Sequence, residues 1–242
     1  MHASQALEAI KHGKHVFVEK PLAITQEELK VLKEALTASD SSLMVGYNRR
    51  FSPHIRKVKS LLETKDNPKN FIMTMNAGYV PENHWTQDRN IGGGRIIGEA
   101  CHYIDLMRFL VGSKIKDYHA VKIGSKYTDE ITDDKSIITL TFEDGSCGSI
   151  HYLANGDKSF PKERIEIFCD NSVLQLDNFR YLKGYGWNGF KKLNLFKQDK
   201  GQQDCVETYI RSVTVGEDSP IESDEIFEVA KTSIAIADLL SS

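Results

Sequence analysis

Few cysteines, no long apolar run and no surplus of basic residues mark this sequence of 242 residues. Its four cysteines form no C-x-x-C pair, so no zinc or redox motif is indicated, and we expect reduced thiols in a cytoplasmic protein. No apolar run approaches the roughly 18 residues of a membrane span, and the first residues do not resemble a signal peptide. The formal net charge of −3 excludes a broad basic surface for nucleic acid. The histidines show no metal-ligand spacing, so we expect no bound metal. Because of the missing apolar run and the net charge, we expect neither a membrane nor a nucleic-acid partner.

Helical and strand-like patterns alternate along the first 63 residues. We expect helix, strand, helix, strand and helix, at residues 3–12, 15–18, 25–36, 43–45 and 52–63. Thr25 and Glu28 have the spacing of a capping box. Strands without polar alternation are typical of a parallel sheet that is buried on both faces. Because a helix precedes the first strand, we expect the chain to start midway through a domain.

The pattern changes after residue 65. Apolar and polar residues alternate in strand-like segments at residues 70–80, 115–124, 135–142, 147–153, 163–169 and 172–177. This alternation predicts a mainly antiparallel sheet with one solvated face. Helices are expected at residues 94–110, 202–215 and 223–240. The predicted fold class is therefore α/β plus α+β, with a partial parallel sheet followed by a large open sheet that has helices on one face.

Glu19-Lys20-Pro21 follows the first predicted strand. This is the carboxyl end of a parallel strand, where open α/β sheets bind ligands. The proline fixes the turn, so the lysine is presented at a defined angle, where it can donate a hydrogen bond to a substrate oxygen and relay its proton. On the triplet alone, a surface lysine before a loop proline is the better interpretation.

A glycine-rich entry to a helix at residues 92–94 is the second candidate feature. Arg95, Glu99, His102 and Asp105 follow it at helical spacing, which predicts one polar stripe. A histidine beside two carboxylates is a plausible acid or base. A solvated helix face with ion pairs explains this segment equally well.

The two features together are more specific than either alone. Glu19-Lys20-Pro21, then Gly46-Tyr47-Asn48-Arg49-Arg50, then residues 92–105 resemble in order the glucose–fructose oxidoreductase/inositol dehydrogenase/rhizopine-catabolism (Gfo/Idh/MocA) family, over residues 2–240. The segments 76–88, 92–105 and 158–163 resemble a branch of that family. Its modules are often fused to zinc-type alcohol-dehydrogenase-like modules and are linked with polysaccharide biosynthesis.

The resemblance implies an NAD(P)-dependent dehydrogenase. It implies the C-terminal part of a Rossmann dinucleotide-binding domain at residues 1–64 and an α+β substrate and oligomerisation domain at residues 65–242. The family's catalytic residues correspond to Lys20 and His102, and the expected cofactor contacts are Glu19, Lys20 and Pro21. It also implies NAD or NADP as cofactor, a sugar or sugar-nucleotide hydroxyl or carbonyl as substrate, and a homodimer or homotetramer through the open sheet.

Two departures from the family pattern stand out. Gly98 occupies the position, four residues before the histidine, where much of the family has an aspartate. Glu99 is the alternative acid, although a shift of one residue turns a side chain by about 100° on a helix. The family's Gly-x-Gly-x-x-Gly fingerprint belongs further upstream, so we expect about 70 residues of the Rossmann domain to be missing.

Four residues are candidates for orienting the substrate: Arg49, His84, Trp85 and Asp105. His84 and Trp85 fit an ordinary loop equally well, and Asp105 also matches a structural position of the family's His-x-x-Asp. Lys158 and Lys162 either bind an anionic group or are simply solvated.

Two alternatives stay open. The isolated chain can be an inactive fragment, or an oligomerisation or ligand-binding module of a larger dehydrogenase. Residues 184–189 fit Gly-x-Gly-x-x-Gly literally, but no helix is expected after them, so a hairpin or loop turn is the better interpretation.

Overall fold

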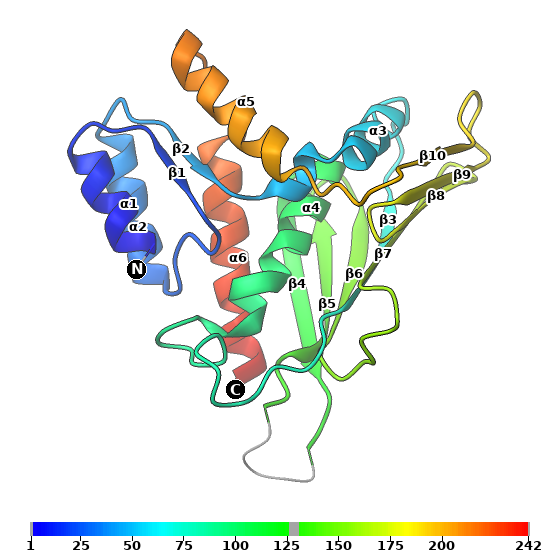
Figure 1. Ribbon diagram of the computed structural model, residues 1–242, viewed down its shortest axis with the longest axis horizontal. Helices are drawn as coiled ribbons and strands as arrows, with labels where there is room; N and C mark the ends of the chain where they lie inside the picture. Colours follow the sequence, from blue (N-terminus) through cyan, green and yellow to red (C-terminus); the bar gives the residue numbers. More distant parts are fainter. Residues whose placement is uncertain (1, 126–130, 242) are drawn as a thin grey trace.

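The computed structural model describes residues 2–125 and 131–241, and it contains two sheets (Figure 1). In the smaller sheet, β1 (Val16–Val18) pairs in parallel with β2 (Leu43–Val45). Helices α1 (His2–Lys11) and α2 (Gln26–Thr37) accompany these strands. Thr25 caps α2 by accepting from the Glu28 amide, while the Glu28 carboxylate accepts from the Thr25 amide. The order predicted for this part of the chain is confirmed.

The larger sheet has eight strands in the order β10-β9-β8-β7-β3-β6-β5-β4. The strands are β3 (Asn70–Asn76), β4 (Ile115–Lys122), β5 (Lys135–Phe142), β6 (Cys147–Leu153), β7 (Glu163–Cys169), β8 (Ser172–Asp177), β9 (Tyr181–Tyr185) and β10 (Lys192–Asn194). All neighbours are antiparallel except β3 and β6, which are parallel. β9 and β10 form a hairpin, in which residues 184–185 end β9 and residues 186–189 belong to the connection, so the predicted hairpin is confirmed and no helix follows as in a phosphate-binding loop.

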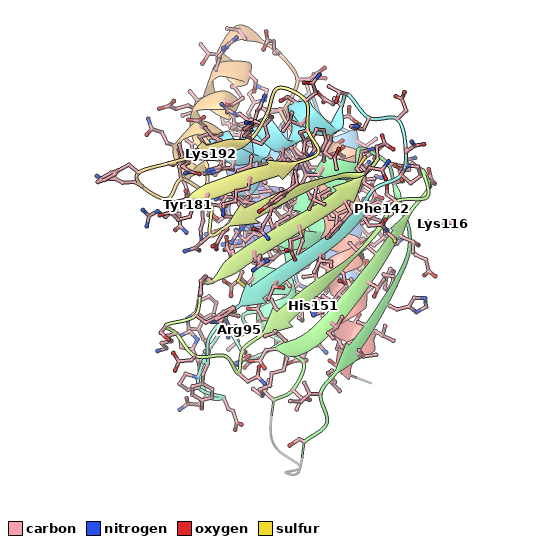
Figure 2. The ribbon with its side chains drawn as sticks, turned by 90° about the vertical axis from the view of Figure 1, so that its right-hand side faces the viewer. Arg95, Lys116, Phe142, His151, Tyr181 and Lys192 are labelled. Atoms are coloured by element: carbon pink, nitrogen blue, oxygen red, sulfur yellow. The ribbon has the colours of Figure 1, made fainter. Side chains whose placement is uncertain are left out.

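Helices cover only one face of this sheet (Figure 1). α4 (Cys101–Val111) and α6 (Ser223–Ser241) lie against that face, and α6 also contacts α2 and β2. A short 3-10 helix, η1 (Asn48–Phe51), leads into α3 (Pro53–Leu62), and α5 (Gln202–Val215) contacts η1. Figure 2 looks onto the opposite face, where side chains stand free of any covering helix. The predicted fold class is therefore confirmed.

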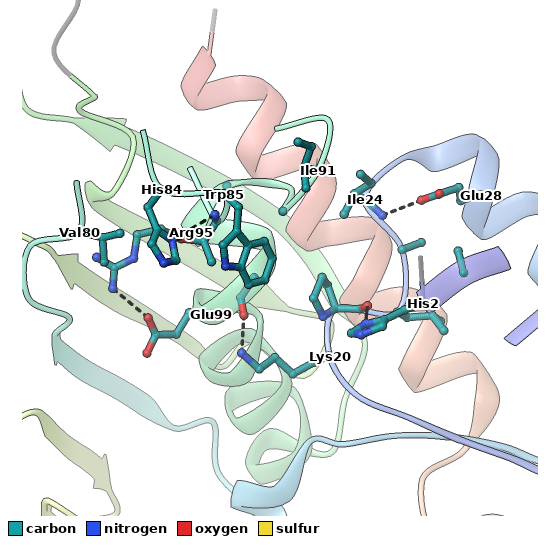
Figure 3. Close-up of a pocket in the computed structure, with 18 residues that line it drawn as sticks. His2, Lys20, Ile24, Glu28, Val80, His84, Trp85, Ile91, Arg95 and Glu99 are labelled. Atoms are coloured by element: carbon teal, nitrogen blue, oxygen red, sulfur yellow. Dashed lines mark hydrogen bonds and ion pairs between the residues drawn. The ribbon is translucent and has the colours of Figure 1, made fainter. Parts of the chain in front are cut away.

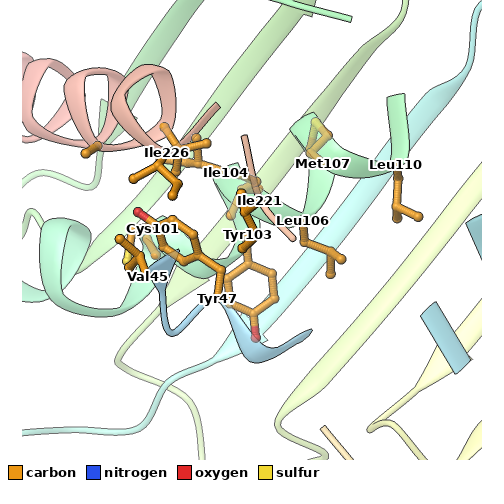
Figure 4. Close-up of a cluster of buried hydrophobic side chains, with 14 of the residues drawn as sticks. Val45, Tyr47, Cys101, Tyr103, Ile104, Leu106, Met107, Leu110, Ile221 and Ile226 are labelled. Atoms are coloured by element: carbon orange, nitrogen blue, oxygen red, sulfur yellow. The ribbon is translucent and has the colours of Figure 1, made fainter. Parts of the chain in front are cut away.

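The hydrophobic core is continuous between the two sheets. Around α4 it joins the end of β2 to α6 through large side chains that are almost completely buried (Figure 4). The residues labelled there are Val45, Tyr47, Cys101, Tyr103, Ile104, Leu106, Met107, Leu110, Ile221 and Ile226. Because interiors of this kind are close-packed, α4 is held rigidly under the end of the small parallel sheet.

The start of the helix that carries His102 differs from the prediction. Instead of a uniform helix from residue 94, a π-helical turn, η2 (Ile96–Ala100), precedes α4. A π turn holds an extra residue, so it changes which side chains share a face. The predicted single polar stripe is therefore wrong: Arg95 pairs with Glu99, whereas Asp105 is fully buried and pairs with Arg50.

Among residues 2–125 and 131–241, no helix has the length and apolar character needed to cross a bilayer. The same residues bring no three His, Cys, Asp or Glu side chains together in a way that would hold a metal ion.

Candidate active site

A cleft of about 450 Å³ opens where β1 ends (Figure 3). The turn after β1, the start of α1 and the long loop between β3 and η2 form its walls. Its volume lies within the range of about 300–1,000 Å³ that is typical of small-molecule sites. The lining residues are His2, Ala3, Lys20, Pro21, Leu22, Ala23, Ile24, Glu28, Val80, His84, Trp85, Thr86, Ile91, Gly92, Gly94, Arg95, Gly98 and Glu99.

Lys20 lies in the wall of this cleft, and its ammonium is bound by a backbone oxygen of η2. Its Nζ donates to the backbone oxygen of Gly98 in η2, at 2.6 Å (Figure 3). On the same turn, His2 Nδ1 lies 2.8 Å from the Pro21 oxygen. A carbonyl only accepts, so this nitrogen carries the hydrogen and Nε2 of a neutral His2 is an acceptor. The Lys20 turn is thus fixed at two points, by η2 and by α1.

Glu19 is exposed and packs over Gly46. A β-carbon at position 46 would lie 3.1 Å from the Glu19 Oε2 atom, so the carboxylate rests close to the backbone of Gly46. The chain supplies this carboxylate at the same strand end as Lys20, as the sequence predicts.

His102 is buried on α4 and does not line the cleft. Its ring makes an edge contact with Tyr47, with the ring centroids 6.3 Å apart. Burial lowers the pKa of His102 well below 6.5, and the charges of Arg49 and Lys20 lower it further. The imidazole is therefore uncharged at neutral pH. Within the described part of the chain, its Nδ1 atom has no hydrogen-bond partner.

Glu99 faces the cleft and is bound by three donors. Its carboxylate accepts from Arg95 Nη2 at 3.0 Å, Tyr152 OH at 2.7 Å and Lys162 Nζ at 2.9 Å. Burial raises the pKa of Glu99, but the hydrogen bonds and charges of these partners outweigh it and bring the pKa to about 2. Glu99 is therefore ionised at neutral pH, and among the described residues no hydrogen bond joins it to His102. This geometry favours an electrostatic role for Glu99 over the expected role of proton partner.

Arg49 and Asp105 are both away from the cleft. Arg49 Nη2 lies 2.8 Å from Glu163 Oε1, and its guanidinium stacks over the Tyr103 ring. The Asp105 carboxylate accepts hydrogen bonds from Arg50 Nε and Nη2, at 2.6 to 2.9 Å. Neither side chain lines the cleft, so direct substrate contact by these two residues is not supported. Their pairing instead fixes η1 against α4 and β7.

His84 and Trp85 do line the cleft. Their ring centroids are 5.8 Å apart, and 60 % of the Trp85 surface is exposed. The sequence did not single out Tyr152, Glu163 or Lys200. They lie on β6, on β7 and before α5, so no local spacing connects them with Lys20 or His102.

Comparison with known proteins identifies the family of this chain. The model described as "GFO/IDH/MocA C-terminal domain" matches residues 55–175. The model described as "Oxidoreductase family, NAD-binding Rossmann fold" matches residues 1–47. The chain belongs to the Gfo/Idh/MocA oxidoreductase family.

Individual relatives agree with this assignment. The oxidoreductase YrbE of Bacillus subtilis is 27 % identical over 185 residues, which are 74 % of this chain and 53 % of that protein. The myo-inositol 2-dehydrogenase of Thermotoga maritima is 24 % identical over 238 residues, covering 93 % of this chain and 70 % of that protein. An NAD-binding oxidoreductase from Klebsiella pneumoniae has the same fold, with a TM-score of 0.84 at 20 % identity over 99 % of this chain and 75 % of that one. The chain thus spans about half of the length of YrbE.

Proposed function

We propose that this chain forms the catalytic part of an NAD(P)-dependent dehydrogenase that acts on a hydroxyl or carbonyl group of a sugar, a sugar nucleotide or a related cyclic polyol. The observation that carries the proposal is the Lys20 ammonium in the wall of the cleft, fixed by the Gly98 oxygen at the carboxyl end of β1. Membership of the Gfo/Idh/MocA family supports the reaction class. The name of the Thermotoga relative, a myo-inositol 2-dehydrogenase, supports a polyol substrate.

The residues present fit the reactive end of a nicotinamide cofactor. The cleft is large enough for a small ring, and the Lys20 ammonium in its wall uses only one of its three N–H donors, on the Gly98 oxygen. Glu19, Lys20 and Pro21 would hold the cofactor at the end of β1. NAD(P) would supply the hydride acceptor or donor when bound.

Lys20 would transfer the proton, with His102 as its partner. An ammonium has three N–H donors, and the bond to Gly98 uses one of them, so Lys20 can also bind a substrate oxygen. As that oxygen gains or loses its proton, Lys20 relays it. His102 is uncharged, and because its pKa is lowered it would act at neutral pH as a neutral hydrogen-bonding group while Lys20 carries the proton. The exposed indole of Trp85 offers an apolar surface for one face of a sugar ring.

The Lys20→Met variant tests the assignment. Removing the proton relay is expected to lower kcat by roughly 10²–10⁴-fold. The Kd for NADH or NADPH is expected to rise far less, because Glu19 and Pro21 remain to hold the cofactor. The measurement is NAD(P)-linked turnover of a panel of sugars and polyols, beside a fluorescence titration with both cofactors. Lys14→Met is the matched control, because Lys14 is exposed and lies just before the same strand. Near-normal turnover in Lys20→Met would reject the role of Lys20.

A non-catalytic ligand-binding or oligomerisation module is the second candidate. The uncovered sheet face favours it, because Ile72, Val121 and Ile137 are exposed. By strand register they lie on the same face as His151, which Figure 2 labels. In that case the purified chain would bind a sugar, or associate through this face as a homodimer or homotetramer, without turnover. Sedimentation of the wild-type chain and of Ile137→Lys, combined with the turnover assay, separates the two functions.

A further inference from the structure

Cations dominate the surroundings of His102. Apart from burial, the largest effects on its pKa come from four basic side chains, and all of them lower it. These side chains are Arg49, Lys20, Lys200 and Lys162. They come from four separate parts of the chain, so the concentration of charge is a product of the fold.

Two carboxylates lie in the same cluster, and both are already engaged. Glu163 Oε1 receives Arg49 at 2.8 Å and Lys200 at 3.0 Å. Glu99 Oε1 receives Lys162 at 2.9 Å. Arg95 also binds Glu99, and its charge is offset by Asp134, which lies 4.0 Å away. The four basic groups minus Glu163 and Glu99 then leave a net charge of +2 in this cluster. Excess charge of one sign in a partly buried region is unfavourable unless a ligand of opposite charge compensates it.

Hydrogen-bond donors are also in surplus. Each lysine ammonium has three N–H donors, and the described contacts of Lys20, Lys162 and Lys200 occupy one each. Arg49 Nε is a further donor that is buried and without a hydrogen-bond partner in the described chain. His102 Nδ1 is also without a partner there, and it donates or accepts according to the tautomer. Glu163 Oε2 is an unpartnered acceptor nearby, but one acceptor does not balance these donors.

The cluster reaches the cleft. Lys20 and Glu99 line it, and Lys162, which binds Glu99, has 44 % of its side chain exposed. Lys200 is less accessible, with 16 % of its side chain exposed. A ligand in the cleft therefore contacts Lys20 directly, and Lys162 is bound to Glu99, which also lines the cleft. Lys200 and Arg49 do not line the cleft and would act on such a ligand through their charge.

We propose that the cleft selects a sugar with an anionic substituent, a carboxylate or a phosphate, and that Lys162 and Lys200 are the residues that determine this specificity. The proposal rests on the function proposed above and narrows its substrate class. Such a group would accept hydrogen bonds from the unused N–H groups of the lysines, and its negative charge would offset the positive charge beside His102.

Calorimetric titration of the purified chain with three sugars tests the proposal. D-glucuronate and D-glucose 6-phosphate carry the two anionic groups, and D-glucose is the neutral analogue. At least one anionic sugar is expected to bind about tenfold more tightly than glucose, which is the effect of one charge-assisted hydrogen bond. High salt is expected to reduce the difference. Which of the two anionic sugars binds better identifies the group.

Lys162→Met and Lys200→Met are each expected to reduce the preference for the anionic sugar by about threefold, because the two lysines together account for the preference of about tenfold. Lys192→Met on β10 is the matched control and is expected to retain it, because that lysine is exposed on the hairpin. If Lys200→Met does not fold, the more exposed Lys162 carries the test alone. Equal binding of glucose, no binding of either anionic sugar, or an unchanged preference in the lysine variants overturns the proposal.

The outcome is distinguishable from failure of the dehydrogenase assignment. A preference for anionic sugars without NAD(P)-linked turnover supports the anion site and rejects the enzyme. Turnover of neutral sugars without a preference for anionic ones supports the enzyme and rejects the anion site.

Discussion

Replacing Glu99 by glutamine should make the protein less stable by an amount that depends on pH. In the folded chain the pKa of Glu99 is about 2, against an ordinary value of 4.5, because Tyr152, Lys162 and Arg95 all donate to its carboxylate. At about 1.4 kcal/mol per pKa unit, this shift corresponds to about 3 kcal/mol of folding free energy at neutral pH.

The sign follows from the direction of the shift. A carboxyl group whose pKa is lower in the folded state stabilises the fold above its unfolded pKa of 4.5. That contribution disappears as the pH falls from 4.5 towards 2, since the unfolded chain then takes up the proton first. The difference between wild type and Glu99→Gln is therefore expected to be largest at neutral pH and to shrink on acidification.

Urea unfolding, followed by tryptophan fluorescence over a series of pH values, measures this difference. Glu82→Gln is the matched control, because Glu82 is exposed on the same loop that borders the cleft. It is expected to change the unfolding free energy by less than about 0.5 kcal/mol at every pH. A loss below about 1 kcal/mol for Glu99→Gln at neutral pH, or a loss that stays constant on acidification, would refute the reasoning.

Three further predictions use the same unfolding assay. Gly92→Ala should cost about 1–3 kcal/mol, because its β-carbon would lie 2.6 Å from a backbone oxygen, whereas Gly98→Ala should be nearly neutral, with its nearest contact at 3.6 Å. Asp105→Asn should cost about 3–5 kcal/mol, because Arg50 keeps a buried charge without its main partner; a loss below 1 kcal/mol would contradict this. The pKa of His102 is lowered in the folded state, so stability should fall as the pH drops below 6.5, and His102→Gln should lessen that fall.

Local signals in the sequence predicted most of the elements. The capping box of Thr25 and Glu28 marked the start of α2, and uninterrupted apolar runs marked β1 and β2. The parallel pairing of β3 with β6 could not be predicted, because alternation shows which face of a strand is buried and not which strand lies beside it. The π turn η2 could not be predicted either, because arguments from residue spacing assume a regular α-helix.

The candidate site could be predicted in part. Lys20 was marked by its place after a buried strand, and the structure brings it to Gly98, 78 residues further along the chain. Arg49 and Asp105 had suitable side chains for a polar substrate, yet burial and ion pairing direct them elsewhere, and residue type alone does not show this. Glu163 and Lys200 could be recognised only from the fold, which places the Lys200 Nζ atom 3.0 Å from the Glu163 Oε1 atom.

The acceptor that holds Lys20 belongs to the main chain. Every amino acid at position 98 that keeps the turn offers the same oxygen, so mutation of that side chain does not by itself release the lysine. The β-carbon of a larger residue would also find room, with its nearest neighbour 3.6 Å away. During evolution, position 98 is thus free to acquire side chains that reshape the cleft beside Lys20, while the anchor of the lysine is inherited unchanged.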